Sequence, residues 1–425
     1  MHRRNFLKIM LGGAVALIGS TAFVKTKPFF ALKNQAQQAL KSPNVRHLRQ
    51  MITEDATRSR IIMWESDDRA TSPAVEYRLP NGEINKIAAK EVSFTDDKTE
   101  TIQYMAELEN LSPGTKYEYR PVWEAGAGDW HNLVTPDDAE NDYTCLIFPD
   151  SQSADYTDWS NLFRGATERV PQASFFVNLG DIVDNGEVHS QWQAWLDSVE
   201  NTGAEIPFVP VMGNHETYNA LWKVRLPYAH LNYFRVPGNN SDDFDGYYYS
   251  FNYGAAHFIV LNTQWEELTG KRDGLLDEQK EWLQRDVAAN PKRWQIVLMH
   301  KDVLQYRING RPERQEGFSD IGTEFMPIFD RLGIDLVFTA HLHTYRNRGR
   351  IYNFQAAEKG PYYILTGVAG DVRYPDLWID HALDLKAAPQ PETDNYLTLR
   401  VTPHELTVQC FLPNGEEIDR VQIAK

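Results

Sequence analysis

The segment Phe175-Phe-Val-Asn-Leu-Gly-Asp-Ile-Val-Asp184 decides the fold class. Its first half is a short apolar run with the length of a buried strand, and Gly180 then interrupts the run. Polar residues follow at once, so Asp181 and Asp184 are expected on a loop at the carboxyl end of that strand. In open α/β sheets, ligands bind beyond the carboxyl ends of the strands. The segment therefore predicts both a buried sheet and a position for a site.

The same pattern of an apolar run followed by polar residues repeats after about residue 138. Strands are expected at residues 146–148, 175–179, 208–212, 258–261, 296–299 and 336–338. Helical periodicity lies between several of them, at residues 191–199, 278–287 and 324–332. Strands that alternate with helices predict an α/β domain.

Residues 45 to about 135 have a different pattern, with short strand-like runs separated by turn signals such as Pro80-Asn-Gly82. The segment Lys116–Arg120 alternates with period two, as a half-buried strand does. These features predict an all-β sandwich, and Leu111–Tyr117 resembles the turn and tyrosine strand of fibronectin type III modules. We predict a fibronectin type III-like domain at residues 43–137 and an α/β domain at residues 138–425.

The start of the chain is predicted to be an export signal. Arg3-Arg4 and Phe6-Leu-Lys8 precede an uncharged apolar run from Ile9 to Val24. The paired arginines resemble the twin-arginine signal of bacteria. The alternative is an uncleaved membrane anchor, but the run is shorter than the ~20 residues that span a bilayer.

We therefore expect a signal peptide at residues 1–25 and a linker at residues 26–42. The twin-arginine export machinery is a predicted partner, and the mature protein is expected to be periplasmic or secreted, with no stable membrane span after processing.

Charge and cysteine content limit the other partners. The formal net charge is -16, which argues against a nucleic-acid polymer because phosphate backbones are bound by Lys/Arg surfaces. The two cysteines, Cys145 and Cys410, lie in apolar strand-like runs. Two buried free thiols are the favoured interpretation. A disulfide is the alternative that an oxidising destination permits.

Five groups of oxygen and imidazole ligands follow predicted strands. They are Asp150-Ser-Gln152, Gly180-Asp-Ile-Val-Asp184, Gly213-Asn-His-Glu216, His300 and Ala340-His-Leu-His343. One such group would mean little. Five groups, each at a strand end, are difficult to explain by packing and indicate a functional site.

The order of these motifs resembles the calcineurin-like metallophosphoesterase superfamily. With the preceding β-sandwich, the chain is similar to the purple acid phosphatase-related branch of that superfamily. The resemblance implies a double β-sheet flanked by helices, an α-β-β-α sandwich. It also implies two metal sites that share Asp181 as a bridge. Asp150, His343 and Gln152 would complete the first site, and Asn214, His300 and His341 would complete the second. For Gln152, the alternative to a ligand role is a structural role.

The implied ligands are carboxylate, amide and imidazole groups, which suit Zn, Mn or Fe, either divalent or trivalent. Two cations can activate a bridging water as the nucleophile and neutralise phosphate oxygens. The catalytic residues would be Asp181, as the bridging ligand, and His215, which could protonate the leaving oxygen or hold the phosphoryl group.

We predict an exported hydrolase of a small phosphoester, in the form of a phosphomonoesterase. One alternative is a phosphodiesterase that acts on nucleotides or phospholipid head groups. Another is a non-enzymatic envelope binding protein, in which the metal domain is only a scaffold.

Two positions depart from the family pattern. Purple acid phosphatases carry a tyrosine ligand three residues after the bridging aspartate, where this chain has Asp184. A coloured iron–tyrosinate site is therefore not expected, and Asp184 is predicted to orient a ligand or its loop. Many superfamily members have a histidine where this chain has Gln152. Substrate contacts from Tyr306, Arg307 and Tyr345 are a weaker expectation, with solvated or structural roles as the alternative.

Overall fold

The structure is a computed structural model that describes residues 44–139, 141–389 and 392–425. The predicted signal peptide (1–25) and linker (26–42) lie outside the described residues. Among the residues it describes, no helix has the length and the apolar character needed to span a bilayer.

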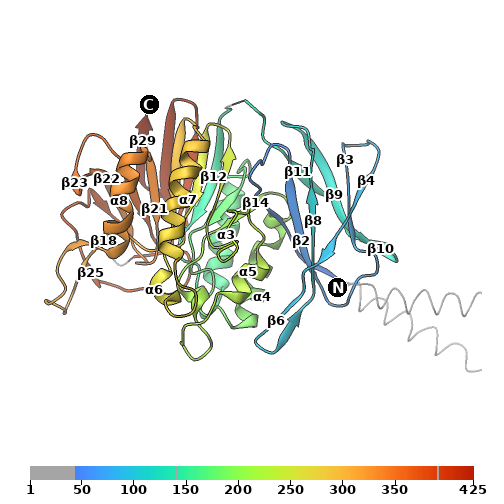
Figure 1. Cartoon of the computed structure of the whole chain (residues 1–425), viewed down its shortest axis with the longest axis horizontal. Helices are drawn as coiled ribbons and strands as arrows, with labels where there is room; N and C mark the ends of the chain where they lie inside the picture. Colours follow the sequence, from blue (N-terminus) through green and yellow to red (C-terminus); the bar gives the residue numbers. More distant parts are fainter. Residues whose placement is uncertain (1–43, 140, 390–391) are drawn as a thin grey trace, which may run out of the picture.

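A ten-stranded sheet forms one half of the α/β region and continues into the N-terminal region (Figure 1). Its strands, in spatial order, are β29 (Glu417–Ala424), β28 (Glu405–Phe411), β27 (Tyr396–Val401), β12 (Tyr143–Phe148), β13 (Phe176–Asn178), β14 (Pro207–Pro210), β1 (Val45–Met51), β2 (Arg60–Ser66), β8 (Gln103–Leu108) and β5 (Lys90–Glu91). Strands β12, β13, β14 and β1 are parallel to one another.

An eight-stranded sheet forms the other half of the α/β region. Its strands are β15 (Tyr249–Tyr253), β16 (Ala256–Val260), β17 (Trp294–Leu298), β21 (Leu336–Thr339), β24 (Tyr362–Thr366), β22 (Tyr345–Tyr352) and β23 (Gln355–Ala356), with β26 (Lys386–Ala387) beside β22. Strands β16, β17, β21 and β24 are parallel.

The helices and the remaining short strands complete the fold. The helices are α3 (Thr157–Arg169), α4 (His189–Gly203), α5 (Tyr228–Tyr233), α6 (Trp265–Leu268), α7 (Leu275–Ala289), α8 (Asp320–Leu332) and the 3-10 turn η1 (His215–Thr217). The N-terminal region adds a five-stranded sheet of β10 (Gly126–Ala127), β9 (Lys116–Trp123), β3 (Ala74–Arg78), β4 (Asn85–Ala88) and β11 (His131–Val134). Three two-stranded pairs are β6 (Phe94–Asp96) with β7 (Thr99–Thr101), β18 (Leu304–Gln305) with β20 (Gly317–Phe318), and β19 (Arg307–Ile308) with β25 (Trp378–Ile379).

The four parallel strands of the second sheet are buried on both faces, as their continuous apolar sequences predict. Successive side chains of β16 alternate between two cores, because strand side chains point to opposite faces. Phe258 and Val260 belong to the core that includes the first sheet. Ile259 belongs to the core that α7 and α8 cover, together with Leu283 and Phe325. The predicted α/β fold with a double sheet is confirmed.

The N-terminal region is all-β, as predicted, but it is not separate from the α/β region. Strand β1 pairs with β2 on one side and with β14 on the other, where Gln50 and Met51 lie opposite Pro207 and Phe208. Met51 lies in the core of the α/β region, whereas the N-terminal region has a second core of its own. The sequence did not predict this pairing between distant segments, and the boundary at residue 137 stays a prediction.

Both cysteines are buried free thiols, which confirms the favoured interpretation. Cys145 lies on β12 and Cys410 on β28, with β27 between these strands. Burial raises the pKa of the Cys145 thiol. Neither cysteine belongs to the acid and histidine groups described below.

Candidate metal centre

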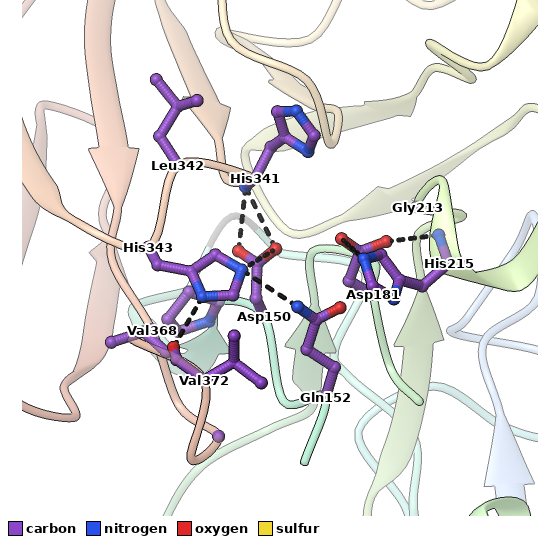
Figure 2. Close-up of polar contacts among 12 residues, drawn as sticks. Asp150, Gln152, Asp181, Gly213, His215, His341, Leu342, His343, Val368 and Val372 are labelled. Atoms are coloured by element: carbon purple, nitrogen blue, oxygen red, sulfur yellow. Dashed lines mark hydrogen bonds and ion pairs between the residues drawn. The ribbon is translucent and has the colours of Figure 1, made fainter. Parts of the chain in front are cut away.

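The predicted ligands converge at the carboxyl ends of parallel strands from both sheets (Figure 2). Asp150, Asp181 and Asn214 follow β12, β13 and β14, whereas His300 follows β17 and the pair His341 and His343 follows β21. Two groups of potential ligand atoms each lie within 4.8 Å of one another: Asp181 with His300 and His341, and Asp150 with Asp181 and His343. Asp181 belongs to both groups, as the bridging position requires. The role of each side chain as a ligand stays a prediction.

The loop that carries Asp181 needs two glycines and a strained backbone. A Cβ atom at Gly180, which has φ of +93°, would lie 2.7 Å from the backbone nitrogen of Gly213. A Cβ atom at Gly213 would lie 2.2 Å from the backbone nitrogen of Asp181. Asp181 itself has φ of 48°, and His341 and His343 also have positive φ. Strained backbone of this kind concentrates at functional sites, and here it brings two loops into direct contact.

His300 faces two oxygen atoms of the group. Its Nδ1 donates to the backbone carbonyl of Leu179 at 2.9 Å, which leaves Nε2 as the ring atom that faces them. That Nε2 lies 3.1 Å from Asn214 Oδ1 and 3.1 Å from Asp181 Oδ2. Burial opposes a charge on His300, but the Asp181 carboxylate outweighs it and raises the pKa of His300 to about 9. The carboxylate of Asp181 therefore favours a positive charge at this position.

The second group is built around Asp150. The backbone N–H of His341 donates to Asp150 Oδ2 at 2.9 Å, and His343 Nε2 lies 3.5 Å from Asp150 Oδ1. His343 Nδ1 donates to the Val372 carbonyl at 2.7 Å, which turns Nε2 toward the carboxylate. Gln152 Nε2 lies 3.3 Å from this His343 Nε2 (Figure 2). The predicted position of Gln152 beside the first site is therefore observed.

Two orphaned atoms test whether these residues fit metal ions. Gln152 Oε1 and His341 Nδ1 are buried and have no hydrogen-bond partner. Burial, reinforced by His300, lowers the pKa of His341 to about 3, so its ring is neutral and has a lone pair at neutral pH. Buried acceptors normally have partners. A cluster of acceptors without matching donors fits a pair of cations, and oxygen and imidazole ligands suit Zn, Mn or Fe.

Glu216 holds the loop of Asp181 and the loop of Gly213 together. It belongs to the motif Gly213-Asn-His-Glu216, but the sequence analysis predicts no role for it. Its carboxylate accepts the backbone N–H groups of Gly213 at 2.6 Å, Asp181 at 3.0 Å and Ile182 at 2.9 Å. Burial, reinforced by the Asp181 charge, raises the pKa of Glu216 to about 7. Glu216 therefore fixes the position of Asp181 relative to Asn214.

His215 lies at the edge of the group with one ring nitrogen free. Nδ1 donates to the backbone carbonyl of Asp184 at 2.6 Å, and Nε2 faces Asp181 Oδ2 at 3.9 Å. The side chain of His215 is 15% exposed, so a ligand can reach it. Asp184 orients His215 through its main chain. Its side chain, whose Oδ1 lies 3.8 Å from the same Nδ1, adds a charge nearby.

Two of the predicted substrate contacts, Tyr306 and Tyr345, have side chains that are buried in other pairings, so the structure lends these predictions no support. Tyr306 is 1% exposed and donates to Asp384, and Tyr345 is 1% exposed and donates to Asp419. The aromatic rings of these two tyrosines pack in the interior, and their hydroxyls make hydrogen bonds there. Arg307 is partly exposed and faces Glu316 and the Asp380 carbonyl, not the ligand groups.

A buried ion pair links the loop that follows His300 to the strand that precedes His341. Arg348 donates to both oxygens of Asp302 at 2.7 Å, and Asp302 also accepts the hydroxyl of Thr339. Asp302 is two residues after His300, and Thr339 is two residues before His341. No local sequence pattern predicts this ion pair, because Asp302 and Arg348 lie far apart along the chain.

Comparisons with known proteins agree with this architecture. The family model for calcineurin-like phosphoesterases matches residues 125–345, and the model for the purple acid phosphatase N-terminal domain matches residues 45–135. A protein of Mycobacterium tuberculosis is 26% identical over 386 residues, which cover 81% of this chain and 70% of that protein. Purple acid phosphatase 18 of Arabidopsis thaliana is 25% identical over 332 residues, 73% of this chain and 68% of that protein. The structure of purple acid phosphatase PPD1 from yellow lupin seeds matches with a TM-score of 0.76 at 16% identity, over 90% of this chain and 74% of that chain.

Proposed function

The chain belongs to the calcineurin-like phosphoesterase family, and on that premise we propose that it is an exported phosphomonoesterase that acts on a small phosphoester. Hydrolysis of phosphoric esters at a dinuclear metal centre is the activity that its relatives support. The observation that carries the proposal is the pair of ligand groups that share Asp181, with the free Nε2 of His215 beside them.

The proposed ligands divide into two sets. Asp150, Asp181, His343 and Gln152 form one set, and Asp181, Asn214, His300 and His341 form the other. Two cations at such a site supply an activated water and neutralise the charge of the phosphate oxygens. The chain holds the ligands in place in advance, through the backbone donors to Asp150 and Asp181 and the carbonyl acceptors behind His300 and His343.

His215 is the proposed proton donor. Its Nδ1 proton is engaged by the Asp184 carbonyl, so only Nε2 can serve a substrate. In the charged form of the ring, Nε2 holds a proton that can pass to the leaving oxygen or bind a phosphoryl oxygen. The same hydrogen bond to Asp184 fixes the ring plane, which keeps Nε2 directed toward Asp181.

Phosphomonoesters are the preferred class because the relatives with assigned names are phosphatases. The alternative activity is that of a phosphodiesterase. Export rests on the twin-arginine sequence at Arg3-Arg4, and periplasmic or secreted localisation follows from it. Zn, Mn and Fe all suit the ligand set.

The test joins metal analysis of the exported protein with a comparison of an aryl phosphate and a bis-aryl phosphate. We expect two metal ions per chain and faster hydrolysis of the monoester. Faster hydrolysis of the diester would establish the phosphodiesterase instead. Full metal content without hydrolysis of any phosphoester would favour the non-enzymatic envelope protein.

Variants separate the proposed roles. Asp181→Asn and His341→Ala should each lose bound metal and nearly all activity, because each removes a ligand. His215→Ala should retain metal and lower kcat, by roughly 100-fold for loss of a general acid. His404→Ala, an exposed histidine on a turn, is the matched control and should behave as wild type. Wild-type turnover in Asp181→Asn would refute the assignment.

A further inference from the structure

Trp222 projects into solvent beside His215. The side chain is 56% exposed, yet its ring meets the His215 ring edge-on, with centroids 5.5 Å apart. Its backbone has φ of 59°, a conformation that bulky residues rarely adopt. Both the exposure and the backbone conformation are unfavourable for an isolated tryptophan. A role for the ring at this position would account for both.

The loop that presents Trp222 is rigidly held. Asn219 accepts the backbone N–H groups of Leu221 at 3.0 Å and Lys223 at 2.9 Å through its side chain, and that of Trp222 at 2.8 Å through its carbonyl. Glu187 accepts the N–H of Ala220 at 2.8 Å. These bonds hold the backbone at Trp222 in place before any ligand arrives, which lowers the entropic cost of binding to its ring.

Tyr374 occupies the opposite end of the centre. It is 39% exposed, and its ring lies 4.9 Å from that of His343, between centroids. Its loop follows β24 and is tied to the site, because the Val372 carbonyl accepts from His343.

The two rings each lie beside a histidine of the centre. Figure 2 shows His343 and His215 on opposite sides of Asp150 and Asp181. Trp222 contacts the ring of His215, the proposed donor to the leaving oxygen, and Tyr374 contacts the ring of His343 on the other side. The group attached to the leaving oxygen must leave the centre past His215, and hence past Trp222.

We infer that Trp222 and Tyr374 form a leaving-group subsite that selects phosphoesters with a planar, uncharged aromatic group, such as a nucleobase or an aryl ring. This inference rests on the proposed function, since it names the substrate class of the same site. Aromatic faces bind planar rings by stacking and discriminate little between one base and another. The partly exposed carboxylate of Asp184, beside His215, disfavours a second anionic group at this rim.

The test compares adenosine 5'-monophosphate with ribose 5-phosphate. The two substrates share the same primary-alcohol leaving group and differ only in the base, so leaving-group chemistry cancels. We expect the metal-loaded wild type to show kcat/KM about 10-fold higher for the nucleotide, the size of one stacking contact. Trp222→Ala and Tyr374→Ala should each reduce that ratio toward one, because each removes a ring that contacts the base. Trp222→Phe, which keeps a ring, should restore part of it.

The control is Tyr352→Ala, an exposed aromatic residue on β22 that should leave the ratio unchanged. An aryl phosphate in the same series separates a general aromatic preference from one for a nucleoside. Equal kcat/KM for nucleotide and ribose phosphate in the wild type would overturn the inference, as would variants that slow both substrates alike. If the wild type hydrolyses neither of these compounds nor any other phosphoester, the proposed function fails. Calorimetric titration of the same two compounds then decides the subsite, and equal affinities would overturn it.

Discussion

Replacing Glu216 by glutamine should weaken the metal centre without removing any proposed ligand. The Glu216 carboxylate uses one oxygen to accept from Gly213 and Asp181, and the other to accept from Ile182 and, at 3.4 Å, from Val183. A glutamine amide offers only one accepting oxygen. In either orientation, its NH2 group faces two backbone N–H groups that previously had an acceptor.

The magnitude follows from the bonds that are lost. The less costly orientation keeps the oxygen near Gly213, at 2.6 Å, and leaves the N–H of Ile182 without a partner. A buried donor without an acceptor costs about 1–3 kcal/mol, and the charge that strengthened the remaining bonds is also gone. We expect a loss of about 2–4 kcal/mol in the free energy of unfolding. Metal affinity should fall by about 10–100-fold, as for residues that orient ligands.

The assay measures metal affinity by titration with a competing chelator, and stability by the thermal midpoint. The matched control is Asp335→Asn. Asp335 is a buried carboxylate that accepts the backbone N–H of Gln295 at 2.8 Å, but it precedes β21 and so lies at the end of the sheet away from the ligands. The control should lower stability and leave metal affinity unchanged. If Glu216→Gln bound metal as tightly as the control does, the proposed role of Glu216 in placing Asp181 would be refuted.

Three further predictions concern stability. Burial lowers the pKa of His230 to about 3, and the unfolded state protonates near 6.5, so acidification between these values favours unfolding. His230→Phe should therefore reduce the loss of stability between pH 7 and pH 5 by about 2 kcal/mol in denaturant titrations at both pH values, and an unchanged pH dependence would contradict this. Arg348→Met should cost about 3–5 kcal/mol because it leaves Asp302 buried without its partner, and Arg348→Met with Asp302→Leu should recover part of that loss in thermal melts. A chelator should lower the thermal midpoint of the wild type, by the equivalent of about 2.7 kcal/mol if metal was present at 100 times Kd, and should not shift that of Asp181→Asn.

Most of the metal centre could be predicted from sequence because its rule is local. Each ligand group directly follows an apolar strand, and parallel strands bring their carboxyl ends to one edge. This places Asp150, Asp181 and His300 without knowledge of any long-range contact. Gln152 was ambiguous because an amide can act as a ligand or as a packing group, and its orphaned Oε1 now favours the ligand.

The misses have a different physical origin. Tyr306 and Tyr345 follow the ligand groups along the chain. Their hydroxyls, however, donate to the carboxylates of Asp384 and Asp419, and no local sequence pattern predicts these pairings. Trp222 and Tyr374 reach the rim from irregular loops, where periodicity gives no direction for a side chain. Glu216 could have been found, since an acid directly after a ligand and a histidine has few solvent-facing alternatives in a tight turn.

The pairing of β1 with β14 has a consequence for how the polypeptide can be divided. A fragment that begins near residue 138 would lose β1 and leave β14 as a bare sheet edge in the middle of what is now a continuous ladder. It would also lose Met51 from the main core. Exposed edges of this kind recruit other strands, so we expect the excised catalytic portion to precipitate. The N-terminal region is therefore part of the main sheet and core of the enzyme, and its removal should destabilise the rest of the fold.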